Sequence, residues 1–230
     1  MIREGKVVVI TGSGRGIGKA AALLFGEQHY RVVILARTQK EIEETGRLVK
    51  KLGADPLVVR ADVRKLADIR KVIARTLKKW GRIDAFINNA AVAYCGNFDE
   101  QSAPQQQEMV ETNFRGLVDF IREMRPVMAG QGGGIIINVA SRAGHAGRPR
   151  YSVYSATKAA VINITNGLAP GLIEDRIKMF CLCPKGTATK MFYDCNPGAI
   201  ADDQPEDVAK VMLEMVEHPE RYTIGDHFDL

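Results

Sequence analysis

Short apolar runs alternate with longer amphipathic stretches along the whole chain, and this alternation constrains the fold more than any other feature. The runs predicted as strands lie at residues 6–10, 31–35, 56–60, 83–87, 134–139 and 177–183, with a last candidate at 223–229. The stretches predicted as helices lie at 16–28, 39–52, 66–80, 103–128, from 152 onward, and at 205–216. Apolar strands separated by helices are typical of a parallel sheet covered on both faces. The chain is therefore predicted to form a single α/β domain over residues 1–230, a doubly wound sheet of six or seven parallel strands with helices on both faces.

The composition excludes several classes of protein. The longest uninterrupted apolar runs have six residues, at 20–25 and 90–95, whereas a membrane-spanning helix needs about 18 or more. The first residues lack the charged and apolar regions of a signal peptide. The net charge of +5 is spread along the whole chain, which argues against a nucleic-acid binder. Four cysteines are too few for a disulfide scaffold, so the sequence predicts a reducing, cytoplasmic location.

A glycine-rich turn from Thr11 to Gly18 follows the first predicted strand. Gly12, Gly16 and Gly18 would let the backbone turn tightly, let a pyrophosphate approach, and let the next helix pack close to the strand. The N-terminus of that helix would offer free N–H groups to the phosphates. Such a turn alone distinguishes poorly between a cofactor site and a plain turn. Its position between a strand and a helix favours a dinucleotide site.

The end of the second predicted strand bears on which dinucleotide binds. An NAD site usually carries an acidic residue there, which binds the ribose 2′-hydroxyl. This chain has Ala36, Arg37 and Thr38, and the next carboxylate is Glu41. The planar guanidinium of Arg37 could bind a 2′-phosphate, with Arg15 from the glycine turn reaching the same group. The alternative is two solvated surface arginines; we predict NADP(H).

Three further residues indicate a reactive site at the same end of the sheet. Tyr154 and Lys158 are separated by one helical turn and share a face. Ser141 follows the fifth predicted strand, at the carboxyl edge where doubly wound sheets bind ligands. A tyrosine and a lysine at this spacing often occur together by chance, and Ser141 and Tyr154 could simply cap and pack. The position of all three at one edge favours a catalytic role.

With these residues the sequence resembles the short-chain dehydrogenase/reductase family, including its 3-oxoacyl-acyl carrier protein reductases, from about residue 6 to residue 229. The ordered set that carries the resemblance is Thr11-Gly-X3-Gly-X-Gly18, Asp62-Val63, Asn88-Asn-Ala-Ala91, Asn113, Ser141, Tyr154-X3-Lys158 and Pro184 through Thr189. The resemblance implies a Rossmann fold and hydride transfer between NADP(H) and a carbonyl or alcohol. It also implies a homodimer or homotetramer.

The resemblance implies a role for each matching residue. Tyr154 would be the acid/base and Ser141 would bind the substrate oxygen. Lys158 would lower the pKa of Tyr154 and hold the ribose, and Asn113 would serve a proton relay. The residues implied to contact the cofactor are Gly12, Ser13, Arg15, Gly16, Ile17, Gly18, Arg37, Thr38, Asp62, Val63, Asn89, Ala90, Ala91, Tyr154, Lys158, Pro184, Thr187 and Thr189.

Four features depart from the family's pattern. Ala91 and Lys185 stand where the family usually has glycine, and the substrate segment at about 185–205 is short. Pro170, followed by a glycine, lies within the helix that begins near residue 152, and an interior proline should end or kink it there. The short segment and the proline mildly favour an alternative function, an NADP-binding sensor or scaffold with little catalysis.

The substrate is only broadly bounded by the sequence. Several basic residues lie around the predicted mouth of the site and would suit a 3-oxoacyl group on a carrier protein. They are Arg142, Arg148, Arg150, Lys185 and Lys190. Residues 129–134, where such reductases often carry a docking patch, contain no basic residue. A general small-molecule carbonyl or alcohol is therefore preferred, with no nucleic-acid or membrane partner.

A metal site is not predicted. Cys181 and Cys183 point to one side of the same predicted strand and, together with Cys195, could suggest metal ligands. No histidine lies at ligand spacing nearby, so thiols packed in the core are favoured. His145 lies near Ser141 in the sequence and could contact substrate or be solvated.

Overall fold

The computed structural model describes residues 5–230, and in them seven parallel strands form one sheet in the order β3-β2-β1-β4-β5-β6-β7. The strands are β1 Val7–Thr11, β2 Arg31–Ala36, β3 Pro56–Arg60, β4 Ala85–Asn88, β5 Gly134–Val139, β6 Ile177–Cys183 and β7 His227–Asp229. The strand order reverses between β1 and β4, and doubly wound sheets bind ligands at the carboxyl edge of that point. The predicted fold is confirmed. The last strand is shorter than the predicted 223–229.

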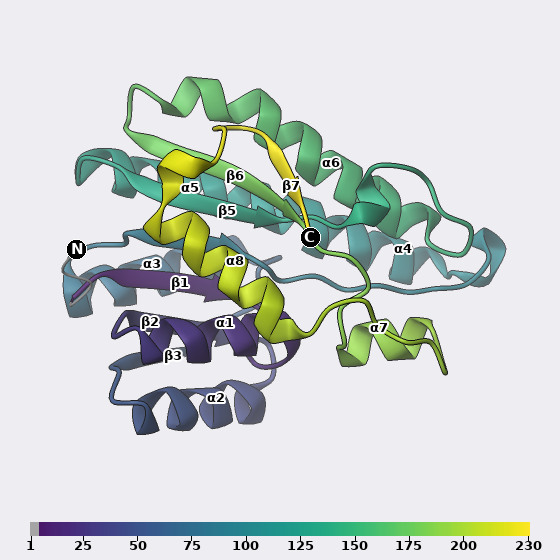
Figure 1. The fold of residues 1–230 in the computed structure, drawn as a ribbon, viewed down its shortest axis with the longest axis horizontal. Helices are drawn as coiled ribbons and strands as arrows, with labels where there is room; N and C mark the ends of the chain where they lie inside the picture. The colour runs from purple at the N-terminus through teal and green to yellow at the C-terminus, as the bar shows by residue number, and fades with distance from the viewer. Residues whose placement is uncertain (1–4) are drawn as a thin grey trace.

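Helices cover both faces of the sheet (Figure 1). They are α1 Gly16–Glu27, α2 Gln39–Lys51, α3 Leu66–Trp80, α4 Ala103–Val110, α5 Gly116–Gly130, α6 Ser152–Leu168, α7 Lys190–Cys195 and α8 Pro205–Glu217. α1, α2 and α8 pack on one face, and α3, α5 and α6 pack on the other. None of these helices is both long and apolar enough to cross a bilayer.

The first strand illustrates why the strands are apolar without alternation. Val7 and Val9 lie in the core beneath α3 and α5, whereas Val8 and Ile10 lie in the core beneath α1 and α8. Successive side chains of a strand point to opposite faces, so a strand covered on both sides needs an apolar residue at every position. Each fully buried side chain of this kind contributes about 1.5–3 kcal/mol.

The helix predicted over 103–128 contains a wide turn. α4 and α5 are joined by a π-helical turn, Glu111–Arg115, so the helical segment continues to Gly130. Gly116, at the end of the wide turn, lies against the chain beyond β3, and a Cβ on it would be 2.7 Å from the Val63 carbonyl oxygen. π-helical turns often mark functional sites, and this one contains Asn113. The helical periodicity of the sequence does not show the extra residue in the turn.

The expected effect of Pro170 is confirmed. α6 ends at Leu168, and a 3₁₀ turn, Ala169–Leu172, follows. Proline has no N–H to donate and its ring collides with the preceding turn, so an α-helix does not continue through it.

The cysteines correct one sequence-based expectation. Cys95, in the segment after β4, forms a disulfide with Cys195, the last residue of α7. The expectation of reduced thiols is therefore wrong for this pair, including the suggested core position of Cys195 as a free thiol. Two cysteines 100 residues apart show no local pattern that would have revealed the pairing. Cys181 and Cys183 are buried free thiols, as predicted.

Candidate active site

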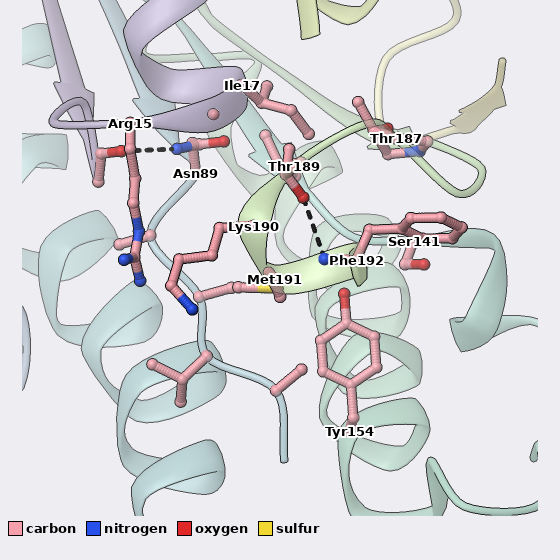
Figure 2. A pocket seen from close by; sticks show the side chains of 18 of the residues that line it. Arg15, Ile17, Asn89, Ser141, Tyr154, Thr187, Thr189, Lys190, Met191 and Phe192 are labelled. Atoms are coloured by element: carbon pink, nitrogen blue, oxygen red, sulfur yellow. Dashed lines mark hydrogen bonds between the residues drawn. The ribbon is translucent and has the colours of Figure 1, made fainter. Parts of the chain in front are cut away.

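A cavity of about 630 Å³ opens at the carboxyl edge of the sheet (Figure 2). Its wall is formed by the segments that follow β1 through β6, together with residues of α6 and α7. This volume is in the range of sites for cofactors and small molecules.

Most of the residues predicted for the site line this cavity. They are Gly12, Arg15, Gly16, Ile17, Arg37, Thr38, Asp62, Val63, Asn89, Ala90, Ala91, Ser141, Tyr154, Lys158, Pro184, Thr187 and Thr189. Ser13, Gly18 and Asn113 are not among the lining residues. The topology thus gathers residues from seven separate parts of the sequence at one edge.

Ser13 and Gly18 serve the local structure of the glycine turn. The Ser13 hydroxyl donates to the Ile10 carbonyl and accepts the Leu35 N–H, each at 2.8 Å, so it ties β1 to β2. A Cβ on Gly18 would lie 2.4 Å from the Gly12 carbonyl oxygen, so α1 can approach the turn only with glycine there. Both residues shape the wall from behind.

The glycine turn has the form of an anion-binding site. Gly12 and Gly16 have φ of 66° and 54°, values that favour glycine. α1 begins after Arg15 with no side-chain cap, so its first N–H groups are available to a phosphate. The Thr11 hydroxyl accepts the N–H groups of Asn89 and Ala90 at 2.9 Å, which fixes the ends of β1 and β4 together.

The two arginines predicted to bind a 2′-phosphate, Arg37 after β2 and Arg15 in the glycine turn, each lie beside a carboxylate. Arg37 contacts Glu108 of α4 at 2.5 Å, and Arg15 lies 3.7 Å from Glu41. The Tyr94 hydroxyl donates to the other oxygen of Glu108 at 2.6 Å. The hydrogen bonds from Tyr94 and Arg37 hold the pKa of Glu108 below its usual range. Sequence analysis missed Glu108, which is 71 residues from Arg37 and belongs to no motif.

Asp62, at the same end of the cavity, is held by a neighbouring arginine. Arg64 donates to both carboxylate oxygens of Asp62 and also lies 3.4 Å from Glu108. Although burial acts in the opposite direction, these contacts keep the pKa of Asp62 below its usual value. Two carboxylates and two arginines, Arg37 and Arg64, therefore form one network beside the cavity.

Ser141, Tyr154 and Lys158 meet at the other end of the cavity. Figure 2 shows the Tyr154 hydroxyl pointing toward Ser141. Lys158 is buried; its Nζ donates to the Val139 carbonyl at 2.8 Å and lies 5.7 Å from the centre of the Tyr154 ring. A phenol and an ammonium close together can supply a proton and a positive charge.

The pKa of Tyr154 differs from the sequence-based expectation. Burial raises it to about 12, and a hydrogen bond with Ser141 acts in the opposite direction. Burial also lowers the pKa of Lys158 to about 8, because both charged forms lose hydration. In the chain alone, burial outweighs the other influences on the pKa of Tyr154, and the tyrosine is a phenol at neutral pH.

Asn113 is nearly inaccessible to solvent, and both the oxygen and the nitrogen of its side-chain amide are hydrogen-bonded. Its Oδ1 accepts the Val92 N–H at 2.8 Å, while its Nδ2 donates to the Val92 carbonyl at 2.9 Å and to Thr157 Oγ1 at 3.1 Å. The wide turn thus fastens the segment after β4 to α6, the helix that carries Tyr154.

α7 forms one wall of the cavity, and the sequence analysis did not predict it as a helix. Thr189 caps it by accepting the Phe192 N–H at 3.2 Å, and Met191 and Phe192 line the cavity (Figure 2). The disulfide from Cys95 holds the far end of the helix at Cys195. A threonine before a six-residue helix is too short a signal to predict the element.

The wall beside Ser141 and α7 is rich in cations. Four of the five basic residues expected at the mouth line the cavity, and Arg150 does not; the four are Arg142, Arg148, Lys185 and Lys190. Lys190 pairs with Asp194 at 2.6 Å. Among residues 5–230, no carboxylate forms an ion pair with any of the other three. One lining carboxylate, Asp202, accepts the Gly186 N–H.

Comparisons with known proteins point to one family. A family model described as short chain dehydrogenase matches residues 6–199. An uncharacterized oxidoreductase of Thermotoga maritima is 34% identical over 213 residues, covering 93% of this chain and 83% of the relative. An uncharacterized oxidoreductase of Staphylococcus aureus is 28% identical, covering 96% of this chain and 95% of the relative.

Solved structures share the whole fold. A 3-ketoacyl-(acyl-carrier-protein) reductase from Brucella melitensis, complexed with NADH, is 28% identical with a TM-score of 0.89, covering 99% of this chain and 97% of that chain. Levodione reductase has a TM-score of 0.91 at 23% identity, covering 99% and 96% of the two chains. The second similarity concerns the fold alone.

Proposed function

The chain belongs to the short-chain dehydrogenase family, and from that premise we propose that it is an NADP(H)-dependent oxidoreductase that interconverts a carbonyl group and an alcohol. The observation that carries the proposal is one cavity with the glycine turn at one end and Ser141, Tyr154 and Lys158 at the other. A protein that only binds the dinucleotide would need the glycine turn but not the three side chains at the other end. A catalyst of hydride transfer needs both, because the oxygen that gains negative charge must be stabilised and protonated.

The residues present fit a nicotinamide dinucleotide. Gly12 and Gly16 allow close approach of a pyrophosphate, and the uncapped start of α1 offers N–H donors. Asp62 and Val63 would line the adenosine end. When bound, the nicotinamide would supply or accept the hydride, and side chains of the chain would supply the proton and stabilise the charge.

In the direction of reduction, Tyr154 donates its phenolic proton to the substrate oxygen. A pKa of about 12 keeps that proton in place at neutral pH. Ser141 donates a hydrogen bond to the same oxygen and stabilises its developing charge. Lys158, whose pKa is about 8, is mostly charged at pH 7 and adds a buried positive charge. In place of the proton relay that the resemblance implies for Asn113, we propose a positioning role, because its side chain already bonds Val92 and Thr157 and so holds the segment after β4 against α6.

The choice of NADP(H) rests on Arg37 at the end of β2 and on the missing carboxylate there. Glu108 now neutralises Arg37, so a 2′-phosphate would take the place of the Glu108 carboxylate. The reductase from Brucella melitensis was solved with NADH, and titration of this chain with NADPH and with NADH decides between the two cofactors.

The cations of the cavity wall support a carbonyl substrate that carries a negative charge. Arg142, Arg148 and Lys185 reach the cavity without an ion-pair partner among residues 5–230. Charges of one sign in a recessed site attract and retain a ligand of the other sign. The proposed substrate is therefore more specific than the general carbonyl compound expected from the sequence. It is an oxo acid, or an acyl group attached to an anionic carrier.

A matched pair of substrates tests the charge. We expect a 3-oxo acid to be reduced with at least tenfold higher kcat/KM than its methyl ester. The variant Arg148→Gln should reduce that ratio, whereas Arg150→Gln, at an exposed position outside the cavity, should retain it. Equal rates for acid and ester in the unmodified protein would contradict the anionic substrate without contradicting the oxidoreductase.

A homodimer or homotetramer and a cytoplasmic location complete the proposal. Val110, Leu168 and Ile173 are exposed apolar side chains on or beside α4 and α6, which suits a symmetric interface. Light scattering that returns the mass of one chain would contradict the oligomer. The Cys95–Cys195 disulfide is uncommon in a reducing compartment, so cell fractionation tests the location: recovery in the cytoplasmic fraction supports it, and recovery outside the cytoplasm contradicts it.

The competing function is a sensor or scaffold that binds NADP(H) without turnover. Oxidation of NADPH, followed by absorbance against a panel of ketones, aldehydes and oxo acids, separates the two. Turnover with any member supports the enzyme. Tight NADPH binding with no turnover across the panel supports the sensor.

A further inference from the structure

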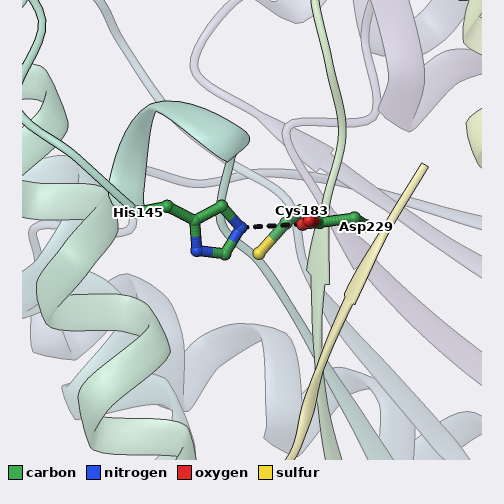
Figure 3. Close-up of side chains that lie close together, drawn as sticks. All are labelled: His145, Cys183 and Asp229. Carbon is green, nitrogen blue, oxygen red and sulfur yellow. Dashed lines mark hydrogen bonds and ion pairs between the residues drawn. The ribbon is translucent and has the colours of Figure 1, made fainter.

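Three side chains of metal-binding types meet outside the cavity, at the edge of the sheet formed by β7 (Figure 3). They are His145, Cys183 and Asp229, and one ligand atom of each lies within 4.8 Å of the other two. His145 Nε2 lies 2.7 Å from Asp229 Oδ1. None of the three lines the cavity of the proposed active site.

The fold itself brings these residues together. Cys183 ends β6 and Asp229 ends β7, and the two are direct partners in the parallel pairing of these strands. His145 directly follows the 3₁₀ turn Arg142–Gly144, which begins after Ser141. The sequence analysis considered Cys183 as a metal ligand but predicted no metal site, because no histidine lies near it in the sequence: His145 precedes Cys183 by a whole helix and strand. Strand register, rather than local spacing, makes the cluster.

The cluster is open to solvent at one side and closed at the other. The side chains of His145 and Asp229 are 30% and 46% exposed, whereas Cys183 is fully buried at the base. An ion could enter between the two exposed groups and reach the thiol. With three ligands from the chain, a fourth position would remain for water.

The donor set points to one class of ion. A thiolate and a carboxylate together bring two negative charges, and among residues 5–230 no lysine or arginine forms an ion pair with Asp229. Sulfur, imidazole nitrogen and a single carboxylate oxygen suit Zn²⁺, whereas Mg²⁺ and Ca²⁺ prefer oxygen donors throughout.

We propose that His145, Cys183 and Asp229 form a Zn²⁺ site. On binding, the Cys183 thiol releases its proton to solvent and its sulfur bonds to the metal. The ion replaces the hydrogen-bonding proton between His145 Nε2 and the Asp229 carboxylate. Bonds to zinc are about 2.0–2.3 Å long, so side-chain rotations draw the three atoms closer together.

The position of the ion gives it a structural role. It joins β7 to the end of β6 and to the turn that follows Ser141. Cys183 also precedes Pro184, which lines the cavity. Occupancy should therefore stabilise the edge of the sheet and hold the turn beside the proposed catalytic serine.

The test uses the full chain with its disulfide intact and without reductant. Zn²⁺ alone is titrated by calorimetry, and Co²⁺ serves as a spectroscopic probe because a cobalt–thiolate bond gives a charge-transfer absorption. We expect one ion per chain and a charge-transfer band that Zn²⁺ abolishes by displacement. His145→Gln, Cys183→Ser and Asp229→Asn should each weaken binding at least tenfold, and Cys183→Ser should remove the band.

Two matched controls separate this cluster from its neighbours. His227 is exposed, with its ring centre 4.9 Å from that of His145, and His227→Gln should retain the band. Cys181 is a buried free thiol two residues from Cys183, and Cys181→Ser should retain it too. Circular dichroism checks that each variant folds. Because His145 and Asp229 are exposed, the variants at these two positions test the site even where Cys183→Ser fails to fold.

The proposal is overturned by an unmodified chain that binds no Zn²⁺ at micromolar concentration. It is also overturned if His145→Gln and Asp229→Asn both retain the charge-transfer band with unchanged affinity. A band that is lost in His227→Gln or in Cys181→Ser as completely as in Cys183→Ser would overturn it too.

Discussion

Removing the Cys95–Cys195 disulfide should strongly destabilise the protein. The bond closes a loop across 100 residues of sequence. In the chain-entropy model, opening a loop of that length returns about 16 cal/mol/K to the unfolded chain, or about 4.7 kcal/mol at 25 °C. Because domains are stable by only about 5–15 kcal/mol, the double variant Cys95→Ser/Cys195→Ser should lose a large share of its stability.

Urea unfolding followed by circular dichroism measures this loss. We expect the double variant and the reduced unmodified chain to show the same lowered midpoint. Reductant should have no further effect on the double variant, which serves as the matched control. Loss of the disulfide also releases the far end of α7, the helix that places Met191 and Phe192 in the cavity wall. The KM for the carbonyl substrate should therefore rise. Equal midpoints for the oxidised chain and the double variant would refute the reasoning.

Two further predictions concern cofactor choice and pH. NADPH should bind at least tenfold tighter than NADH, a difference of about 1.4 kcal/mol. Arg37→Ala should remove most of this preference. Glu108→Gln should increase the preference, because the carboxylate no longer competes for Arg37. Fluorescence titration with both cofactors measures these affinities, and equal affinities in the unmodified chain would contradict the NADP(H) choice. The pKa of Lys158 is about 8 in the folded chain and 10.5 in the unfolded chain. Between these two pH values the unfolded chain binds more protons than the folded chain. The free energy of unfolding should therefore rise with pH from about 8 to 10.5, by up to about 3 kcal/mol. Urea midpoints across this range should show the rise in the unmodified chain, and an equal rise in Lys158→Met would show that another group causes it.

The edge of the sheet that holds the site could be predicted because it follows from local patterns. Ser141 comes directly after an apolar run, and the glycine turn lies between a strand and a helix. Parallel strands end at one edge, so residues after different strands must converge there. The same reasoning located the end of α6, because proline acts on the helix that contains it.

Contacts between distant segments could not be predicted in this way. Glu108 reaches Arg37 from a helix 71 residues further along the chain, and Cys195 meets Cys95 across 100 residues. The wide turn around Asn113 adds a residue to a helix without changing its apolar pattern. The pKa of Tyr154 depends on burial, which the sequence does not show, and burial outweighs its neighbours.

The turnover of Tyr154→Phe tests the central claim most directly. The substitution keeps the ring and removes the proton that reaches the substrate oxygen. With the best substrate and NADPH, turnover should fall by at least the ~10²–10⁴ typical of a general acid, while NADPH binding stays nearly unchanged. Tyr193→Phe, at an exposed position outside the cavity, should leave both unchanged. A Tyr154→Phe protein that turns over at a near-normal rate would contradict the account.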